Sequence, residues 1–377
     1  MTIRSPLLLG SILVLLIALA HSPTAAIAER ASPPAPNTAV RFTHLTTRDG
    51  LSQSAVTTTL QDSHGFMWIG TNGGLNRYDG YTFTVYQHDP RDPNSLSDDQ
   101  VMDLHEDADG GLWVATHGGV NRFDPQTETF THFRHDPHDP NSLAGDTIFS
   151  IFQDTQGHLW FGGPPAMGGL TRFDPHTETF TRYPGRFDDR QVFQGGGVWD
   201  GVEDQDGNLW LAADSVLARF DPRTESFTYY TPDSGDGRLA ALHQDETGTL
   251  WVGGSAGLYR FNPQEERFTA YQVDHPLLVY DILPNDDGTL WISSQGDGLY
   301  LFDPPRGHFL AHYTHDPSQP TSLSHDRVQD LFRDRAGVVW IATYDGVSLF
   351  DPRQTQFAHY RHEPENPNSL ADDAVWG

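Results

Sequence analysis

Short apolar stretches alternate along most of the chain with polar turns that contain glycine or proline. A clean copy of this pattern holds four stretches with strand character, at residues 101–107, 112–116, 120–124 and 129–134. Asp109-Gly110 is a hairpin signal, and Pro125 ends the third stretch because proline cannot donate a hydrogen bond to a sheet. The pattern therefore predicts a unit of four antiparallel strands.

This unit is repeated seven times. Each copy carries Asp-x-x-Gly-x-x-Trp, and Asn285 is the one substitute for the aspartate. The repeated tryptophans are Trp68, Trp113, Trp160, Trp210, Trp251, Trp291 and Trp340. Their spacing of 40 to 50 residues predicts an all-β fold, a seven-bladed β-propeller of four-stranded antiparallel blades. We expect the tryptophans to pack between neighbouring blades and Asp-x-x-Gly to form turns.

The repeat array begins and ends out of phase. Residues 41–45 (RFTHL) match the fourth strand of a blade but precede any first strand. We expect them to pair with the outer edge of the seventh blade and close the ring, which removes an exposed edge. The propeller is thus predicted over residues 41–356. Residues 357–377 predict the start of an eighth repeat in a second propeller, because residues 362–376 copy residues 88–102, as in a fragment of a longer protein.

The first 40 residues differ in composition from the repeats. Residues 1–28 fit a signal peptide, with Arg4, an apolar run and the cleavage sequence Ala26-Ile27-Ala28. An uncleaved membrane anchor is the alternative. Residues 29–40 form a linker rich in proline and alanine. In both cases we expect export to the periplasm or the extracellular face of the inner membrane.

Charge and composition exclude several functions. The formal net charge of −28 argues against binding to nucleic acid or anionic lipid, because both need a basic surface. The chain has no cysteine, which excludes thiolate catalysis and thiolate metal sites. No phosphate-binding loop or nucleophile elbow is found, so no cofactor is predicted.

The unit NSLSDDQVMDLHEDADGGLWVATHGGVNRFDPQTETFTHF, residues 94–133, resembles the two-component regulator propeller repeat. The resemblance covers residues 41–377 and implies an exported sensor region. It also implies downstream partners in the same parent protein: a second propeller, a β-sandwich, and a membrane-linked output module that is a histidine kinase or a diguanylate cyclase. In several branches the ligands are oligosaccharides. The resemblance is compatible with a dimer formed through those later modules.

Irregular positions of the first strands are the candidates for ligand binding, because the first strands of a propeller line its central channel. The second residue of each first strand is Thr57, Met102, Phe149, Trp199, Ala240, Tyr280 or Gln329, and the next position is Thr58, Asp103, Ser150, Asp200, Ala241, Asp281 or Asp330. A saccharide site needs aromatic faces beside carboxylates that accept hydroxyl hydrogen bonds. The predicted ligand-binding residues are Phe149, Trp199, Asp200, Tyr280, Asp281 and Asp330. The alternative is that these aromatic rings pack against the next blade while the aspartates bind backbone N–H groups.

Trp199 lies outside the series of seven tryptophans. It follows three glycines and the divergent loop of residues 184–194, and loops of unusual composition often carry function. Arg186 and Arg190 in that loop could pair with a uronate or a sulfate.

Histidine suggests two further readings. His88, His135, His315 and His362 occupy the same loop position in different blades, which favours turn roles over a metal site. Some propellers are lyases, and the candidate bases for such an enzyme are His105 and His243. Both fall at the same repeat position, which favours a structural role. A protein-interaction scaffold is the third hypothesis.

Overall fold

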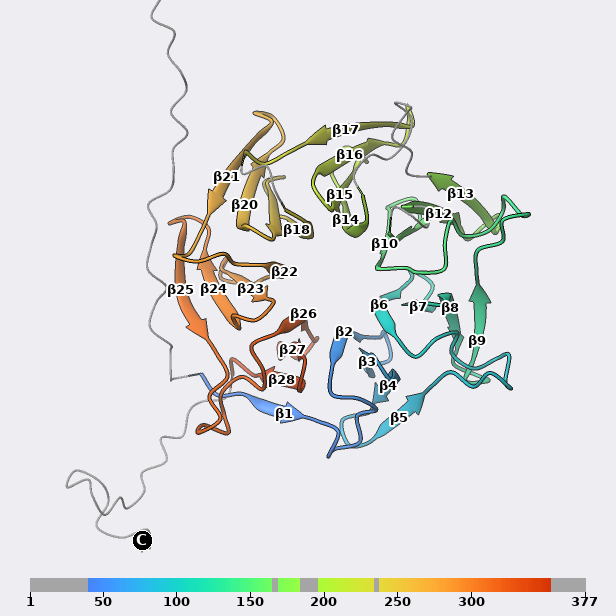
Figure 1. The fold of residues 1–377 in the computed structure, drawn as a ribbon, viewed down its shortest axis with the longest axis horizontal. Helices are drawn as coiled ribbons and strands as arrows, with labels where there is room; N and C mark the ends of the chain where they lie inside the picture. Colours follow the sequence, from blue (N-terminus) through green and yellow to red (C-terminus); the bar gives the residue numbers. More distant parts are fainter. Residues whose placement is uncertain (1–39, 165–168, 184–195, 234–236, 354–377) are drawn as a thin grey trace, which may run out of the picture.

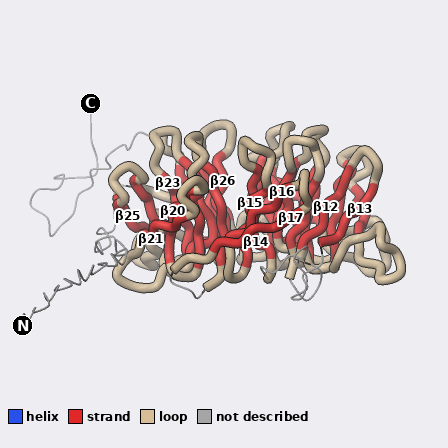
Figure 2. Tube along the Cα trace, turned by 90° about the horizontal axis from the view of Figure 1, so that it is seen from above, coloured by secondary structure: helices blue, strands red, loops and turns tan. Residues whose placement is uncertain are grey.

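The computed structural model describes residues 40–164, 169–183, 196–233 and 237–353. Within these ranges every regular element is a β-strand, and the strands form seven four-stranded antiparallel sheets. The sheets are arranged as blades around a central axis, and the ring is a flat disc (Figures 1 and 2). The predicted seven-bladed propeller is confirmed.

The strands follow one another from the centre of each blade to its rim. Blade 1 holds β2 (Val56–Gln61), β3 (Met67–Thr71), β4 (Gly74–Tyr78) and β5 (Phe83–Tyr86), and blade 2 holds β6 (Val101–Glu106), β7 (Leu112–Thr116), β8 (Gly119–Asp124) and β9 (Thr129–Phe133). Blade 3 holds β10 (Ser150–Gln153), β11 (Leu159–Gly162), β12 (Leu170–Asp174) and β13 (Thr179–Tyr183), and blade 4 holds β14 (Val198–Glu203), β15 (Leu209–Ala213), β16 (Leu217–Asp221) and β17 (Ser226–Tyr230). Blade 5 holds β18 (Leu239–Gln244), β19 (Leu250–Gly254), β20 (Gly257–Asn262) and β21 (Arg267–Tyr271), and blade 6 holds β22 (Val279–Pro284), β23 (Leu290–Ser294), β24 (Leu299–Asp303) and β25 (His308–Tyr313). Blade 7 holds β26 (Val328–Arg333), β27 (Val339–Thr343), β28 (Gly346–Phe350) and β1 (Thr43–Leu45).

The N-terminal strand closes the ring. In Figure 1, β1 lies along the outer edge of blade 7, beside β28. The two strands are antiparallel, and Thr43 is opposite Leu349 while Leu45 is opposite Val347. The prediction that residues 41–45 complete the seventh blade is therefore confirmed, with the strand itself confined to Thr43–Leu45.

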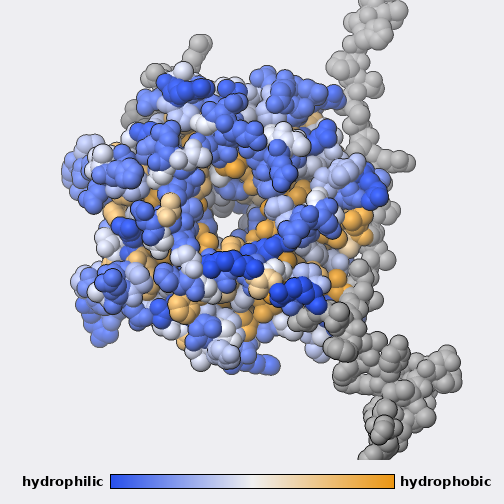
Figure 3. All heavy atoms as spheres, turned by 180° about the vertical axis from the view of Figure 1, so that it is seen from behind, coloured by the Kyte–Doolittle hydropathy of each residue, from blue (hydrophilic) through white to orange (hydrophobic). Residues whose placement is uncertain are grey.

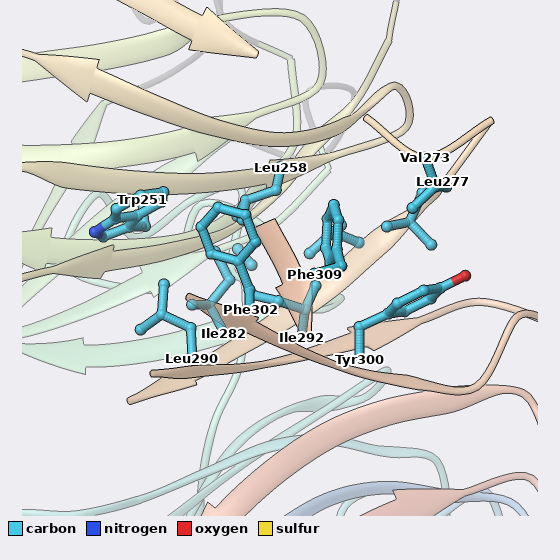
Figure 4. Packing of buried hydrophobic residues seen from close by; sticks show 12 residues of the cluster. Trp251, Leu258, Val273, Leu277, Ile282, Leu290, Ile292, Tyr300, Phe302 and Phe309 are labelled. Carbon is cyan, nitrogen blue, oxygen red and sulfur yellow. The ribbon is translucent and has the colours of Figure 1, made fainter. Parts of the chain in front are cut away.

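The core consists of apolar clusters between successive blades. The second strand of every blade is buried at each of its residues, because one of its faces meets the preceding blade and the other meets the following one. Figure 4 shows one such cluster, in which Trp251 of blade 5 packs with Ile282, Leu290 and Phe302 of blade 6. The predicted packing role of the repeated tryptophans is confirmed.

The repeated aspartate does more than form a turn. In blade 3, Asp154 accepts the backbone N–H groups of Gln156 and His158 on Oδ1, and on Oδ2 it accepts the indole N–H of Trp160 at 2.9 Å. The same bond between the carboxylate and the indole Nε1 joins aspartate and tryptophan in blades 1, 2, 4, 5 and 7. The motif thus ties the first hairpin of each of these blades to the tryptophan that fills the next interface.

The predicted turn roles of the loop histidines are confirmed where the structure describes them. His88, His135 and His315 each use Nδ1 in a 2.7 Å hydrogen bond to a backbone carbonyl of their own loop. Among the described residues, no group of three or more His, Cys, Asp or Glu side chains could hold a metal ion.

Several predictions fall on residues outside the described ranges. They are the signal peptide at 1–28, nearly all of the linker at 29–40, the loop with Arg186 and Arg190, His362, and the eighth repeat at 357–377. In the part of the chain that the structure describes, no helix has the length and apolar character needed to cross a membrane.

Candidate functional site

A cavity of about 190 Å³ lies in the central channel, where the first strands begin. Figure 3 shows the opening at the centre of the ring. The lining residues are Thr57, Thr58, Met102, Asp103, Phe149, Trp199, Asp200, Ala240, Tyr280, Asp281, Gln329 and Asp330. The cavity is smaller than the roughly 300–1,000 Å³ of pockets for drug-sized ligands, so it fits a small molecule or one unit of a larger one.

A β-bulge places these side chains in the channel. In six of the seven first strands, the pairing with the second strand of the same blade skips the second residue. In blade 4, for example, Val198 and Asp200 are paired and Trp199 between them is not. The extra residue has no partner in the ladder, so its side chain is free to face the channel. Blade 3 is the exception, and there Phe149 directly precedes β10 and donates its N–H to Gly162.

The four channel aspartates bind backbone N–H groups. Asp200 accepts the N–H of Gly201 on Oδ1 and that of Leu242 in blade 5 on Oδ2, both at 2.7 Å. Asp103 and Asp281 bind their own and the following blade in the same way. Asp330 accepts both the N–H and the hydroxyl of Thr59 in blade 1. The aspartates therefore link first strands across blade interfaces, and their part in ligand binding stays a prediction.

The same carboxyls border the cavity and hold protons unusually tightly. Burial, followed by the mutual repulsion of the carboxylates, raises the pKa of Asp103 to about 8 and that of Asp200 to about 7. Burial raises the pKa of Asp330 to about 6, and burial with repulsion from Asp330 and Asp200 raises the pKa of Asp281 well above its usual value. The backbone N–H donors act in the opposite direction but are outweighed. The channel carboxyls thus exchange protons near neutral pH, and among the described lining residues no cation offsets the charge that they carry when ionised.

The aromatic residues form a stack along the mouth of the cavity. Phe149 and Trp199 are parallel within 9°, with ring centroids 4.3 Å apart. Asp214, in the turn after β15, fixes Trp199 by accepting its indole N–H at 2.7 Å, and it also accepts the N–H of Gly197. The guanidinium of Arg238 lies 4.3 Å from the centroid of Trp199.

Arg238 also contacts the next aromatic residue around the ring. Its guanidinium carbon is 5.0 Å from the ring centroid of Tyr280, and its Nη2 donates a hydrogen bond to the Tyr280 hydroxyl. The stack Phe149–Trp199–Arg238–Tyr280 therefore runs through blades 3, 4, 5 and 6. It brings together the three aromatic residues named from the sequence.

The sequence prediction left out six lining residues, Thr57, Thr58, Met102, Asp103, Ala240 and Gln329, and it also left out Asp214 and Arg238, which contact Trp199. Asp103 and Gln329 stand in the same alignment columns as the predicted residues, so a signal for them was present. Arg238 directly precedes β18, and Asp214 lies in a turn. Neither has a repeat position that marks it.

The candidate bases of a lyase do not reach the cavity. His105 on β6 and His243 on β18 belong to blades that are not adjacent, and neither lines the channel site. Burial lowers the pKa of both imidazoles, as expected for neutral packed side chains. The described residues thus give these histidines structural positions only.

The fold and the cavity define a seven-bladed propeller with a solvent-accessible site at the mouth of its channel. Four segments, residues 50–73, 95–118, 142–164 and 322–345, match the family described as two component regulator propeller. These four segments match that repeat, which confirms the resemblance found in the sequence.

Solved structures extend this relationship over most of the chain. The extracellular domain of a putative hybrid two-component system from B. thetaiotaomicron is 25% identical, with a TM-score of 0.76 over 88% of this chain and 44% of that one. A virginiamycin B lyase from Staphylococcus aureus has a TM-score of 0.63 at 14% identity, over 82% of this chain and 98% of that one, and shares the fold alone.

A sequence relative is the Histidine kinase P4 of Formosa agariphila, 48% identical over 56 residues. The match covers 15% of this chain and 4% of the kinase. The chain therefore spans less than half the length of the two-component relative and a small part of the kinase.

Proposed function

We propose that this chain is the exported, ligand-sensing propeller of a two-component signal-transduction protein and is not itself an enzyme. Its likeness to an extracellular domain of a hybrid two-component system supports this function, as does its likeness to a histidine kinase. The signal would pass to an output module elsewhere in the parent protein. The ligand would be a glycan fragment or a molecule of similar size.

The cavity at the mouth of the channel is the observation that carries the proposal. The irregular side chains of otherwise repetitive first strands meet there, and they combine aromatic rings with carboxyls and an amide. This mixture of apolar walls and a few polar groups is typical of small-molecule sites. Because every blade contributes a residue, a bound ligand would contact the whole ring.

The lyase alternative has only the shared fold in its favour. A lyase needs a base placed at the reacting carbon. Among the described lining residues there is no histidine or lysine. The aspartates accept hydrogen bonds from N–H or hydroxyl donors of the first strands, on both oxygens in Asp200 and on Oδ2 in Asp330. These carboxyls are positioned to hold strands together.

Calorimetry on the full chain tests the proposal. The ligands are tetrasaccharides of glucose, N-acetylglucosamine, glucosamine and galacturonic acid, and we expect at least one to bind. Trp199→Ala should then weaken binding at least tenfold, because it removes the central ring of the stack. Tyr81→Ala is the matched control, since Tyr81 is an aromatic side chain that is 90% exposed, lies between β4 and β5, and does not line the cavity. Equal affinities for the Trp199 variant and the native chain would refute the site.

A further inference from the structure

Trp199, the aromatic residue best placed to stack on a ligand, is already covered by neighbouring side chains. Phe149 reaches it from blade 3 and Arg238 from blade 5, which are the two blades that flank its own. Arg238 also covers Tyr280 in blade 6. A ligand that stacks on Trp199 or Tyr280 from the side of Arg238 must therefore displace the guanidinium.

The group that occupies this aromatic pair is a cation. A guanidinium 4.3 Å and 5.0 Å from two ring centroids is in the range where the negative faces of aromatic rings attract positive charge. Trp199 and Tyr280 thus already contact a cation in this structure. The cation in this contact is a side chain of the protein itself.

The carboxyls beneath the aromatic pair have no cation of their own. Among the described residues, no ion pair joins Arg238 to any carboxylate, and no lysine, arginine or histidine lines the cavity. Asp103, Asp200, Asp281 and Asp330 therefore face one another across a channel in a strongly acidic protein. A small cation that entered the cavity would favour the ionised forms of these carboxyls, whereas Arg238 at the rim makes no ion pair with them.

Gln329 adds an independent sign of an absent binding partner. Its side-chain Nε2 is buried in the cavity lining and has no hydrogen-bond partner among the described residues. A buried donor without an acceptor is unfavourable, and a turn of this side chain towards the cavity would let a hydroxyl oxygen of a ligand supply the acceptor. A ligand that carries both an ammonium group and a hydroxyl group would match the carboxyls and this amide.

We propose that the ligand is an amino sugar, or a small polyol with a protonated amine, that displaces Arg238 from Trp199 and Tyr280 and places its ammonium group among the channel carboxyls. This inference rests on the proposed sensing function and names its ligand class. The ligand competes successfully because it reaches both the aromatic pair and the carboxyls, and Arg238 reaches only the first. Arg238 is therefore an internal competitor for the site.

Three β-1,4 tetrasaccharides of the same shape test the charge requirement: glucosamine, N-acetylglucosamine and glucose oligomers. We expect calorimetry on the full chain to show the glucosamine tetramer binding at least tenfold more tightly than the other two. Equal or tighter binding of the glucose or N-acetylglucosamine tetramer would overturn the inference and leave the sensing function standing. Failure of every saccharide to bind would count against the sensing function itself.

Variants locate the binding. Arg238→Ala should tighten binding of the glucosamine tetramer by about two- to tenfold, because the competing cation is gone. Asp200→Asn should weaken it at least tenfold, whereas Asp286→Asn, which removes the same charge from a side chain that is 99% exposed, should leave it unchanged. Weaker binding by the Arg238 variant, or equal effects of the two aspartate variants, would refute the model of an internal competitor. If Asp200→Asn prevents folding, the affinity of the Arg238→Ala variant for the glucosamine tetramer still tests the model.

Discussion

Substitution of Asp154 by alanine tests the role of the repeated aspartate in the stability of the ring. Asp154 is 7% exposed, and Trp160, whose indole N–H it accepts, is 0% exposed. The variant leaves that N–H buried without a partner, which costs about 1–3 kcal/mol. It also removes the acceptor for two backbone N–H groups of the turn, at about 0.5–1 kcal/mol each when water replaces the carboxylate. The expected loss in the free energy of unfolding is therefore about 2–5 kcal/mol.

Urea unfolding followed by tryptophan fluorescence and circular dichroism measures this loss. The matched control is Asp79→Ala, because Asp79 also accepts two backbone N–H groups of a turn but is fully exposed and bonds to no tryptophan. The control should lower the urea midpoint only slightly, since water can satisfy both donors. A loss below about 1 kcal/mol for Asp154→Ala, or one equal to that of the control, would show that the bond to the indole contributes nothing.

Three further predictions concern the closure, the turns and the channel. Deletion of residues 41–46 exposes the edge of β28, so the free energy of unfolding should fall by about 3 kcal/mol or more. The variant should also self-associate in size-exclusion chromatography, and a stable monomer would contradict this prediction. In urea unfolding, Gly119→Ala should lower the free energy of unfolding by more than about 2 kcal/mol, and Gly248→Ala should lower it by about 1 kcal/mol. Both glycines have positive φ, but only at Gly119 would the new Cβ meet a backbone oxygen, that of Phe133 at 2.4 Å. Because the pKa of Asp103 is raised to about 8 on folding, its contribution to stability is complete below about pH 4 and is lost as the pH rises towards 8. Asp103→Asn should therefore flatten the fall in unfolding free energy between pH 5 and 8, and an unchanged slope would exclude this assignment.

The fold could be predicted from the sequence because its constraints are local and repeated. Asp-x-x-Gly-x-x-Trp fixes a hairpin and an interface residue within seven positions, and the interval between copies sets the number of strands. Ring closure could be predicted because residues 41–45 match the fourth strand of a blade but precede any first strand. The β-bulges could not be predicted, because both faces of these strands are covered by neighbouring blades and the pattern of apolar and polar residues does not show where the side chains change face.

The site was predicted only in part for a related reason. Alignment on the repeat gave the column that faces the channel, so Phe149, Trp199 and Tyr280 were assigned to one place correctly. The contacts of those rings depend on which neighbour each side chain meets, and that is not periodic. Arg238, which contacts Trp199 and Tyr280, stands just before its strand, at a position where the repeats share no single residue type.

The inner junctions of the ring show where ligand binding could alter the propeller. Carboxylates bridge blades 2 to 3, 4 to 5, 6 to 7 and 7 to 1. The Thr57 and Ser150 hydroxyls donate to backbone carbonyls across two other junctions, at 2.8 and 3.5 Å. At the junction of blades 5 and 6 the corresponding residue is Ala241, which has no polar side chain, and the link at the rim is the Arg238–Tyr280 hydrogen bond. A ligand that displaces Arg238 would therefore break a hydrogen bond between blades 5 and 6, so occupancy of the cavity and the packing of these two blades would be coupled.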